Sequence, residues 1–221
     1  MSTFFKIKKK CAVCGAENEI QVWGSTSVFG FYDLDFRPPE HERSLLYLKV
    51  EECSKCGFVW FDIESNEHAD VYKKIADSYS YVECDGINFA SRYSENFYKM
   101  FIINKHLSMP EISSFIMLRN VAWSCDDSKD YENAKICRIK ALKYIEDLLI
   151  KNPKDESLIL IKIDFLRRSE KYDELINSYN DYEFTIEDYK QTCRFQKHLA
   201  KKEDNKIHTF EELAAFINNK Y

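Results

Sequence analysis

Glycine and proline are scarce in this sequence, with five and four copies among 221 residues. This scarcity excludes collagen-like and low-complexity chains. The chain also lacks any apolar run near the roughly 18 residues that a membrane span requires, and its first ten residues contain no apolar core of signal-peptide length. These absences predict a soluble, cytoplasmic protein that has no membrane partner.

Positive charge is also in deficit, because 32 basic and 37 acidic residues give a net charge of -5. This balance disfavours a protein that holds nucleic acid mainly by neutralising phosphates. A hydrophobic content of 45%, with 15% aromatic residues, is sufficient for a folded core. The five histidines are scattered without a His-Glu-x-x-His pattern, and no nucleophile or phosphate-loop motif occurs. The sequence favours a non-catalytic protein over an enzyme without deciding between them.

The hydrophobic pattern changes near residues 64–66. Upstream, short runs of β-branched and aromatic residues predict strands at 19–23, 47–50 and 58–63, with an irregular loop over 24–44. Downstream, apolar residues recur with helical period, so we expect an α+β chain with a β-rich domain over 1–65 and an all-α domain over 66–221. The predicted helices span about 67–80, 88–107, 111–127, 130–151, 154–169, 172–180, 185–202 and 209–219. The spacing of Thr185-x-x-Asp188 and Thr209-x-x-Glu212 predicts a capping box at the start of each of the last two.

Two segments of the helical region resemble each other at an offset of 41 residues. They are Lys129-Asp-Tyr-Glu-Asn-Ala134 and Glu170-Lys-Tyr-Asp-Glu-Leu175. Each places a tyrosine three positions before a small or apolar residue near the start of a predicted helix. The pattern resembles the tetratricopeptide repeat, although the offset exceeds the usual 34 residues and Leu175 stands where alanine is expected. We therefore expect tetratricopeptide-like helical hairpins.

Four of the eight cysteines form two copies of one motif, Cys11-Ala-Val-Cys14-Gly15 and Cys53-Ser-Lys-Cys56-Gly57. Two residues between cysteines let a tight turn aim both sulfurs at one point, and the glycine permits the positive φ that such a turn needs. Four thiolates match the tetrahedral preference of Zn²⁺. The motif predicts one structural zinc per chain on Cys11, Cys14, Cys53 and Cys56, within a zinc ribbon. An iron centre on the same sulfurs and redox-active or unliganded pairs are the alternatives.

The remaining cysteines, and the lysines before the first motif, have plainer interpretations. Cys84, Cys125, Cys137 and Cys193 have no metal-ligand spacing and are expected to be buried, inert thiols. Lys6, Lys8, Lys9 and Lys10 form a basic run that is either a solvated charge run or a small phosphate-contacting patch. Together with exposed aromatic residues such as Trp23 or Trp60, this run is the basis of a nucleic-acid hypothesis that the overall acidity opposes.

The segment between the motifs, Tyr32-Asp-Leu-Asp-Phe-Arg-Pro-Pro-Glu-His-Glu-Arg-Ser44, is polar and carries two adjacent prolines. Asp33, Asp35, Arg37 and Arg43 can converge on one another as an ion-pair network. They can instead converge on a ligand, because functional residues favour loops on rigid scaffolds. Both interpretations stay open at this point.

The order of these motifs resembles that of a known family. A Cys-x-x-Cys-Gly motif precedes Asp-Leu-Asp-Phe-Arg-Pro-Pro with Arg43-Ser44, and a hydrophobic strand then leads into Glu52-Cys53-x-x-Cys56-Gly57-Phe58. This order, over residues 8–63, is similar to a family of uncharacterised bacterial proteins, a domain of unknown function with a zinc ribbon and a tetratricopeptide-like tail. The resemblance implies zinc on the four cysteines and assigns the two aspartates and two arginines of the loop to the same module. It implies no reaction.

Two functions compete. The first is a zinc-binding, non-catalytic module that recognises a protein or peptide, which the helical hairpins and the absent catalytic motifs favour. The second is an enzyme or small-ligand receptor with its site at Asp33, Asp35, Arg37 and Arg43, near the junction of the two predicted domains.

Overall fold

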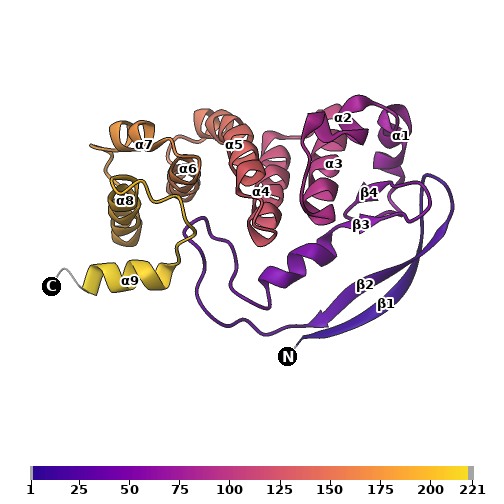
Figure 1. Cartoon of the computed structure of the whole chain (residues 1–221), viewed down its shortest axis with the longest axis horizontal. Helices are drawn as coiled ribbons and strands as arrows, with labels where there is room; N and C mark the ends of the chain where they lie inside the picture. Colours follow the sequence, from indigo (N-terminus) through magenta and orange to yellow (C-terminus); the bar gives the residue numbers. More distant parts are fainter. Residues whose placement is uncertain (1, 219–221) are drawn as a thin grey trace. The chain divides into compact units, whose positions relative to one another are not determined.

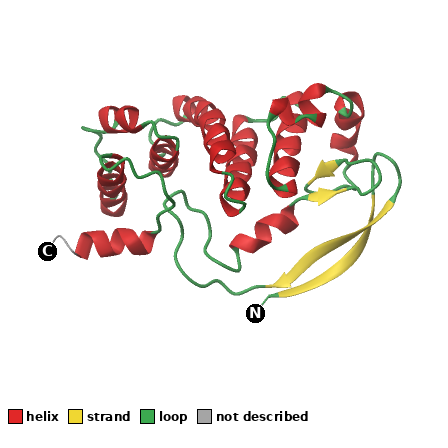
Figure 2. Cartoon of the chain, in the orientation of Figure 1, coloured by secondary structure: helices red, strands yellow, loops and turns green. Residues whose placement is uncertain are grey.

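The computed structural model describes residues 2–218 of the chain. Helices make up most of these residues, and two small two-stranded antiparallel sheets lie in the N-terminal part, as an α+β chain requires (Figure 2). The residues group into two compact units. Unit 1 holds the described residues up to Phe29 together with Glu40–Ala134, and unit 2 holds Gly30–Pro39 and the described residues from Lys135 onward. The predicted border after residue 65 falls inside unit 1, and independent folding of 1–65 stays a prediction.

The larger sheet of unit 1 is a hairpin of β1 (Thr3–Lys10) and β2 (Glu17–Ser25), in which Ile7 lies opposite Ile20. The predicted strand at 19–23 is confirmed as part of β2. Strand β1 was not predicted, because its lysines obscure the alternation of apolar and polar residues that identifies a strand. The second sheet pairs β3 (Glu51–Glu52) with β4 (Val59–Trp60).

The prediction of a strand at 47–50 is wrong. This stretch belongs to a 3₁₀ helix, η1 (Arg43–Lys49), which buries Leu45 and Leu46. A short apolar run has the same appearance in a strand and in a helical turn, so periodicity cannot separate them. The predicted strand at 58–63 shortens to the two residues of β4.

Helices form the remaining regular structure of both units (Figure 1). All the predicted helices occur, and the apolar run of residues 157–166 is helical. The helix predicted over 67–80 is divided, because the Ser78 side chain accepts a hydrogen bond from the Tyr81 amide and begins a new turn. Among residues 2–218, no helix combines the length and apolarity needed to cross a membrane. The helices are α1 (Asn66–Ile75), α2 (Tyr79–Val82), η2 (Cys84–Gly86), α3 (Arg92–His106), α4 (Glu111–Asp127), α5 (Tyr131–Lys151), α6 (Glu156–Arg168), α7 (Tyr172–Ser178), α8 (Glu187–Ala200) and α9 (Phe210–Asn218).

The helix ends show how the chain turns with so little glycine. Ser108, Lys129, Glu170 and Glu203 follow helices and adopt left-handed φ values of 51°, 59°, 61° and 54°. After each, the next amide bonds the carbonyl five residues earlier, as in the glycine-ended Schellman motif. One case is the Asp130 N–H, which bonds the Cys125 carbonyl at 2.8 Å. A left-handed conformation costs a non-glycine residue about 1–2 kcal/mol. These turns therefore carry backbone strain.

Replacing Lys129 with glycine is expected to stabilise the protein by about 0.5–1 kcal/mol, because the relief of left-handed strain exceeds the entropy that glycine adds to the unfolded chain. Lys129 is exposed, so its side chain contributes little packing. Urea unfolding measures the change. Lys154→Gly, at an exposed turn lysine outside the left-handed set, is the control and should lower stability. Equal destabilisation by both substitutions would show that no strain resides at Lys129.

Gly30–Pro39, called the strap below, is the part of the predicted loop that packs in unit 2. Its Leu34 joins an apolar cluster with Phe195, Leu199 and Leu213. The strap runs beside the segment that leads into α9 (Figure 1), where Asp33 and Thr209 form an antiparallel β-bridge. The loop is irregular, as predicted, yet its centre is buried.

Candidate metal centre

The four predicted cysteines converge in unit 1. The Sγ atoms of Cys11, Cys14, Cys53 and Cys56 all lie within 4.8 Å of one another. The Sγ atoms of Cys11 and Cys56 are 3.8 Å apart, and those of Cys14 and Cys53 are 3.6 Å apart. Four sulfurs around a tetrahedral zinc with Zn–S bonds of about 2.3 Å lie about 3.8 Å from one another. The cluster can therefore hold one metal ion, and the identity of that ion stays a prediction.

The two motifs fold into equivalent knuckles. In the first, Cys11 N–H bonds the Ala16 carbonyl at 2.9 Å and Gly15 N–H bonds the Cys11 carbonyl at 2.8 Å. In the second, Cys53 N–H bonds the Phe58 carbonyl at 2.8 Å and Gly57 N–H bonds the Cys53 carbonyl at 2.9 Å. The following glycines have φ of 71° and 73°, so the predicted need for positive φ is confirmed. The repeated sequence motif thus gives a repeated geometry that aims two sulfurs inward from each side.

Backbone amides point at the sulfurs and prepare them for a cation. Burial opposes ionisation of Cys53, but the amides of Cys56 and Lys55 and the Asn18 side chain outweigh it and lower the pKa of this thiol to about 6. Burial raises the pKa of Cys11, despite amide hydrogen bonds to its sulfur. Binding of a metal requires all four thiols to lose their protons, so the site couples metal affinity to pH.

Asn18 in β2 links the two knuckles. Its Oδ1 accepts hydrogen bonds from the Ser54 amide and hydroxyl, each at 2.9 Å, while its Nδ2 lies 3.6 Å from the Cys53 sulfur. The side chain is 7% exposed. Nothing in the sequence near the cysteines marks this asparagine, because its role arises from a contact across 35 residues.

Two tyrosines attach the second knuckle to the helices. The Tyr72 hydroxyl of α1 donates to the Cys56 carbonyl, and the Tyr81 hydroxyl of α2 donates to the Gly57 carbonyl at 3.0 Å. The rings of Tyr72 and Tyr81 also contact each other edge to face. Burial raises the pKa of Tyr72 to about 12, so its hydroxyl stays protonated and can donate. The cysteine cluster therefore fixes the position of helices as well as strands.

Two of the four lysines before Cys11, Lys6 and Lys9, bond acidic partners closely. Lys9 bonds Glu51 at 2.7 Å and Asp62 at 3.0 Å, while Lys6 pairs with Glu19 at 2.5 Å. Trp60, named with Trp23 as an exposed aromatic, is buried instead, because it stacks on His68 with ring centroids 4.0 Å apart. Both observations weaken the nucleic-acid hypothesis.

The structure brings three of the four loop candidates together. Asp33, Asp35 and Arg37 form one tight turn of the strap, in which the Phe36 and Arg37 amides bond the Asp33 carbonyl at 2.9 Å and the Asp35 carboxylate at 3.2 Å. All three are at most 3% exposed. Arg43 belongs to unit 1, at the start of η1. These contacts fit a structural network, and a ligand site at these residues stays a hypothesis.

The other four cysteines are buried thiols. Burial raises the pKa of Cys84 to about 11 and also raises the pKa of Cys193. Protonated thiols are poor nucleophiles and poor metal ligands. Their arrangement agrees with the interpretation of inert core residues.

Comparisons of the chain with protein families, with curated proteins and with solved structures found no match. The interpretation of the cysteine cluster therefore rests on its own geometry.

Proposed function

We propose that this protein is a zinc-binding, non-catalytic module that recognises a protein or peptide partner. One structural Zn²⁺ would bind Cys11, Cys14, Cys53 and Cys56. The observation that carries this proposal is the convergence of four sulfurs within 4.8 Å, from two knuckles of the same geometry. Such a site supplies folding energy and has no open position for substrate.

The surroundings of the sulfurs favour a closed metal site over redox-active or unliganded cysteine pairs. Cys11 and Cys53 are 2% and 0% exposed, which suits a closed structural site better than a thiol pair that must meet a redox partner. Each Cys-x-x-Cys pair lies in a tight turn, whereas a thioredoxin-type pair opens a helix. The arrangement supports the zinc-ribbon interpretation of the N-terminal part.

The helical part supports an interaction role. The turns at Lys129 and Glu170, the two segments that resemble each other in sequence, share their hydrogen bonds: Asp130 N–H to the Cys125 carbonyl corresponds to Lys171 N–H to the Leu166 carbonyl. Ala134 is fully buried at the first turn and Leu175 at the second. These parallels are the basis for proposing tetratricopeptide-like hairpins, and they agree with the resemblance to the bacterial family, which is itself a proposal. Helical hairpins of this kind present surfaces for partners.

The decisive experiment is elemental analysis of the purified protein. We expect one zinc per chain, released together with four thiols when a thiol reagent is titrated in. An iron centre would add visible absorption that zinc lacks. A folded chain that contains no metal would overturn the proposal. For the interaction role, crosslinking followed by affinity capture from the source cell should recover one specific protein, and repeated recovery of none would count against that part.

A further inference from the structure

The strap occupies unit 2 as a peptide folded into a tight turn, which Asp33 N–H closes by bonding the Arg37 carbonyl at 3.0 Å. Its backbone pairs with residues 208–210: Leu34 N–H bonds the His208 carbonyl, and Phe210 N–H bonds the Tyr32 carbonyl, each at 2.9 Å. These two bonds form one antiparallel bridge at Asp33 and Thr209, just before the turn. In peptide recognition, such backbone bonds give affinity and side-chain pockets give specificity.

The strap side chains supply anchors of three kinds. Leu34, 1% exposed, enters the apolar cluster of Phe195, Leu199 and Leu213. Asp35 faces Arg168 of α6, with 3.9 Å between Oδ2 and Nη1. The ring of Phe36 lies 5.6 Å from that of Phe210. Leu34 thus stands between two acidic residues, and the aromatic Phe36 follows the second of them.

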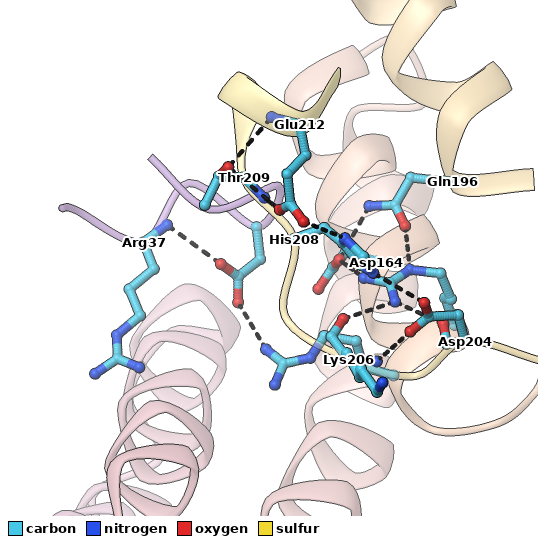
Figure 3. A network of polar contacts seen from close by, with 11 residues as sticks. Arg37, Asp164, Gln196, Asp204, Lys206, His208, Thr209 and Glu212 are labelled. Carbon is cyan, nitrogen blue, oxygen red and sulfur yellow. Dashed lines mark hydrogen bonds and ion pairs between the residues drawn. The ribbon is translucent and has the colours of Figure 1, made fainter. Parts of the chain in front are cut away.

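The surface that receives the strap is organised by contacts of its own. Arg167 donates to the carbonyls of Asp204 and Lys206 at 2.7 and 2.8 Å. His208 lies between Asp204 and Glu212, at 3.2 and 3.0 Å (Figure 3). None of these contacts involves the strap.

The start of α9 is likewise capped by contacts that do not involve the strap. Thr209 N–H bonds the Glu212 carboxylate at 2.7 Å, and Glu212 N–H bonds the Thr209 hydroxyl at 3.4 Å, as the predicted capping box requires. Residues 204–212 are therefore held by contacts with α6 and α9, in addition to the two backbone bonds to the strap. A surface fixed in advance loses little entropy when it binds.

The strap, by contrast, contains a strained backbone conformation. Phe36 has a φ of 61°, a conformation that is rare for a bulky side chain and is held only by its surroundings. On the N-terminal side of the buried turn, Phe29, Phe31 and Tyr32 are 63%, 51% and 43% exposed. The strap therefore adapts to unit 2 directly after a segment that is not buried.

We propose that unit 2 is a receptor for a peptide turn with the pattern acidic–leucine–acidic–aromatic, and that the strap is its resident ligand. A partner protein carrying such a segment binds by displacing the strap. This inference rests on the proposed interaction function and names its partner class. Because a tethered strap competes at an effective concentration on the order of millimolar, a partner peptide binds the intact chain weakly and binds a strap-released chain well.

The test uses the full chain and a labelled decapeptide, Gly-Phe-Tyr-Asp-Leu-Asp-Phe-Arg-Pro-Pro, which is the strap sequence. Leu34→Asp places a carboxylate among Phe195, Leu199 and Leu213 and so releases the strap. We expect this variant to bind the decapeptide at least about tenfold more tightly than the wild type, as measured by fluorescence anisotropy. Leu34→Met keeps the strap seated and should match the wild type. A decapeptide with aspartate at the leucine position should bind neither protein.

Retained helical circular dichroism in Leu34→Asp, without decapeptide binding, would overturn the proposal. Hydrogen exchange of the wild type gives a second test that needs no variant. The Leu34 and Phe210 amides should exchange at least about tenfold faster than amides of α6 and α8, because the strap opens locally. Exchange of all these amides at one rate would show that the strap is inseparable from the fold, which also overturns the proposal.

Two further readouts separate the alternatives. Light scattering tests whether the strap of one copy occupies unit 2 of a second copy. A wild-type dimer that becomes a monomer in Leu34→Asp would show this, and would overturn the proposal that the strap occupies unit 2 of its own chain. Zinc content, measured on the same samples, distinguishes this inference from the proposed metal site. If the decapeptide does not bind while the chain still contains one zinc, only the receptor proposal is refuted and the metal site is not.

Discussion

Replacing Cys53 with serine is expected to remove the metal from the chain and to unfold the knuckles together with the β1–β2 hairpin. Structural zinc contributes an apparent 10–16 kcal/mol in small zinc-finger peptides, which is as large as the whole stability of an ordinary domain, about 5–15 kcal/mol. A two-stranded hairpin is marginal by itself, so the N-terminal part has little else to replace the metal. Metal content by elemental analysis should fall to near zero.

Tryptophan fluorescence reports the unfolding of the knuckles without a contribution from unit 2. The three tryptophans, Trp23, Trp60 and Trp123, all lie in unit 1. Trp60 is 6% exposed and lies three residues after Gly57 of the second knuckle. Its emission should shift to longer wavelength in Cys53→Ser. The helical circular dichroism that α6–α9 contribute should be retained, because these helices belong to unit 2.

Cys193→Ala is the matched control, since it removes a buried thiol of unit 2. This variant should keep one metal per chain and the wild-type tryptophan emission, with a modest loss of stability. If Cys53→Ser kept its metal and its emission, the four sulfurs would not form the site.

The helices could be predicted from the sequence because their signals are local. Apolar periodicity located α3–α9 to within a few residues, and the capping box at Thr209 and Glu212 forms as predicted. The corresponding box at Thr185 is wrong: the Thr185 amide bonds Glu156 of α6 at 2.6 Å, and α8 begins without a side-chain cap. The Thr185 amide thus bonds a carboxylate 29 residues away instead of Asp188, and the local spacing of residues cannot predict such a contact.

The same distinction applies to the sites. The cysteine cluster was predictable because two residues of spacing fix each knuckle. The contacts of Asn18, Tyr72 and Tyr81 with the knuckles were not, since they join residues 16 to 36 positions apart. Nor does the sequence show that Leu34 is buried while Phe31 is exposed. That choice depends on which side chain meets α8 and α9.

Replacing Arg167 with methionine is expected to destabilise unit 2 by about 3–5 kcal/mol, because a buried carboxylate loses its main partner. Arg167 is 0% exposed and its guanidinium bonds Asp164 at 2.8 Å and Gln196 at 2.5 Å, in addition to two carbonyls of residues 204–206. Urea unfolding followed by circular dichroism should show an earlier transition for α6–α9. Tryptophan fluorescence, which reports unit 1, should be almost unchanged. Arg194→Met, at an exposed arginine of α8, should stay within about 0.5 kcal/mol of the wild type.

The pH dependence tests the same network through Asp164. Burial opposes its ionisation, but the charges of Arg167 and Arg168 outweigh burial and hold the pKa of this carboxyl below its ordinary value. A lowered pKa stabilises the fold above the unfolded-state value of about 3.9 and loses that stabilisation as pH falls. Wild-type stability should therefore rise between pH 3 and pH 5, and Arg167→Met should show a smaller rise, because burial then opposes a weaker attraction. Asp164→Asn in the Arg167→Met background removes the buried charge and should recover part of the stability. A loss below about 1 kcal/mol in Arg167→Met, with an unchanged pH profile, would show that the pair contributes no more than a surface ion pair does.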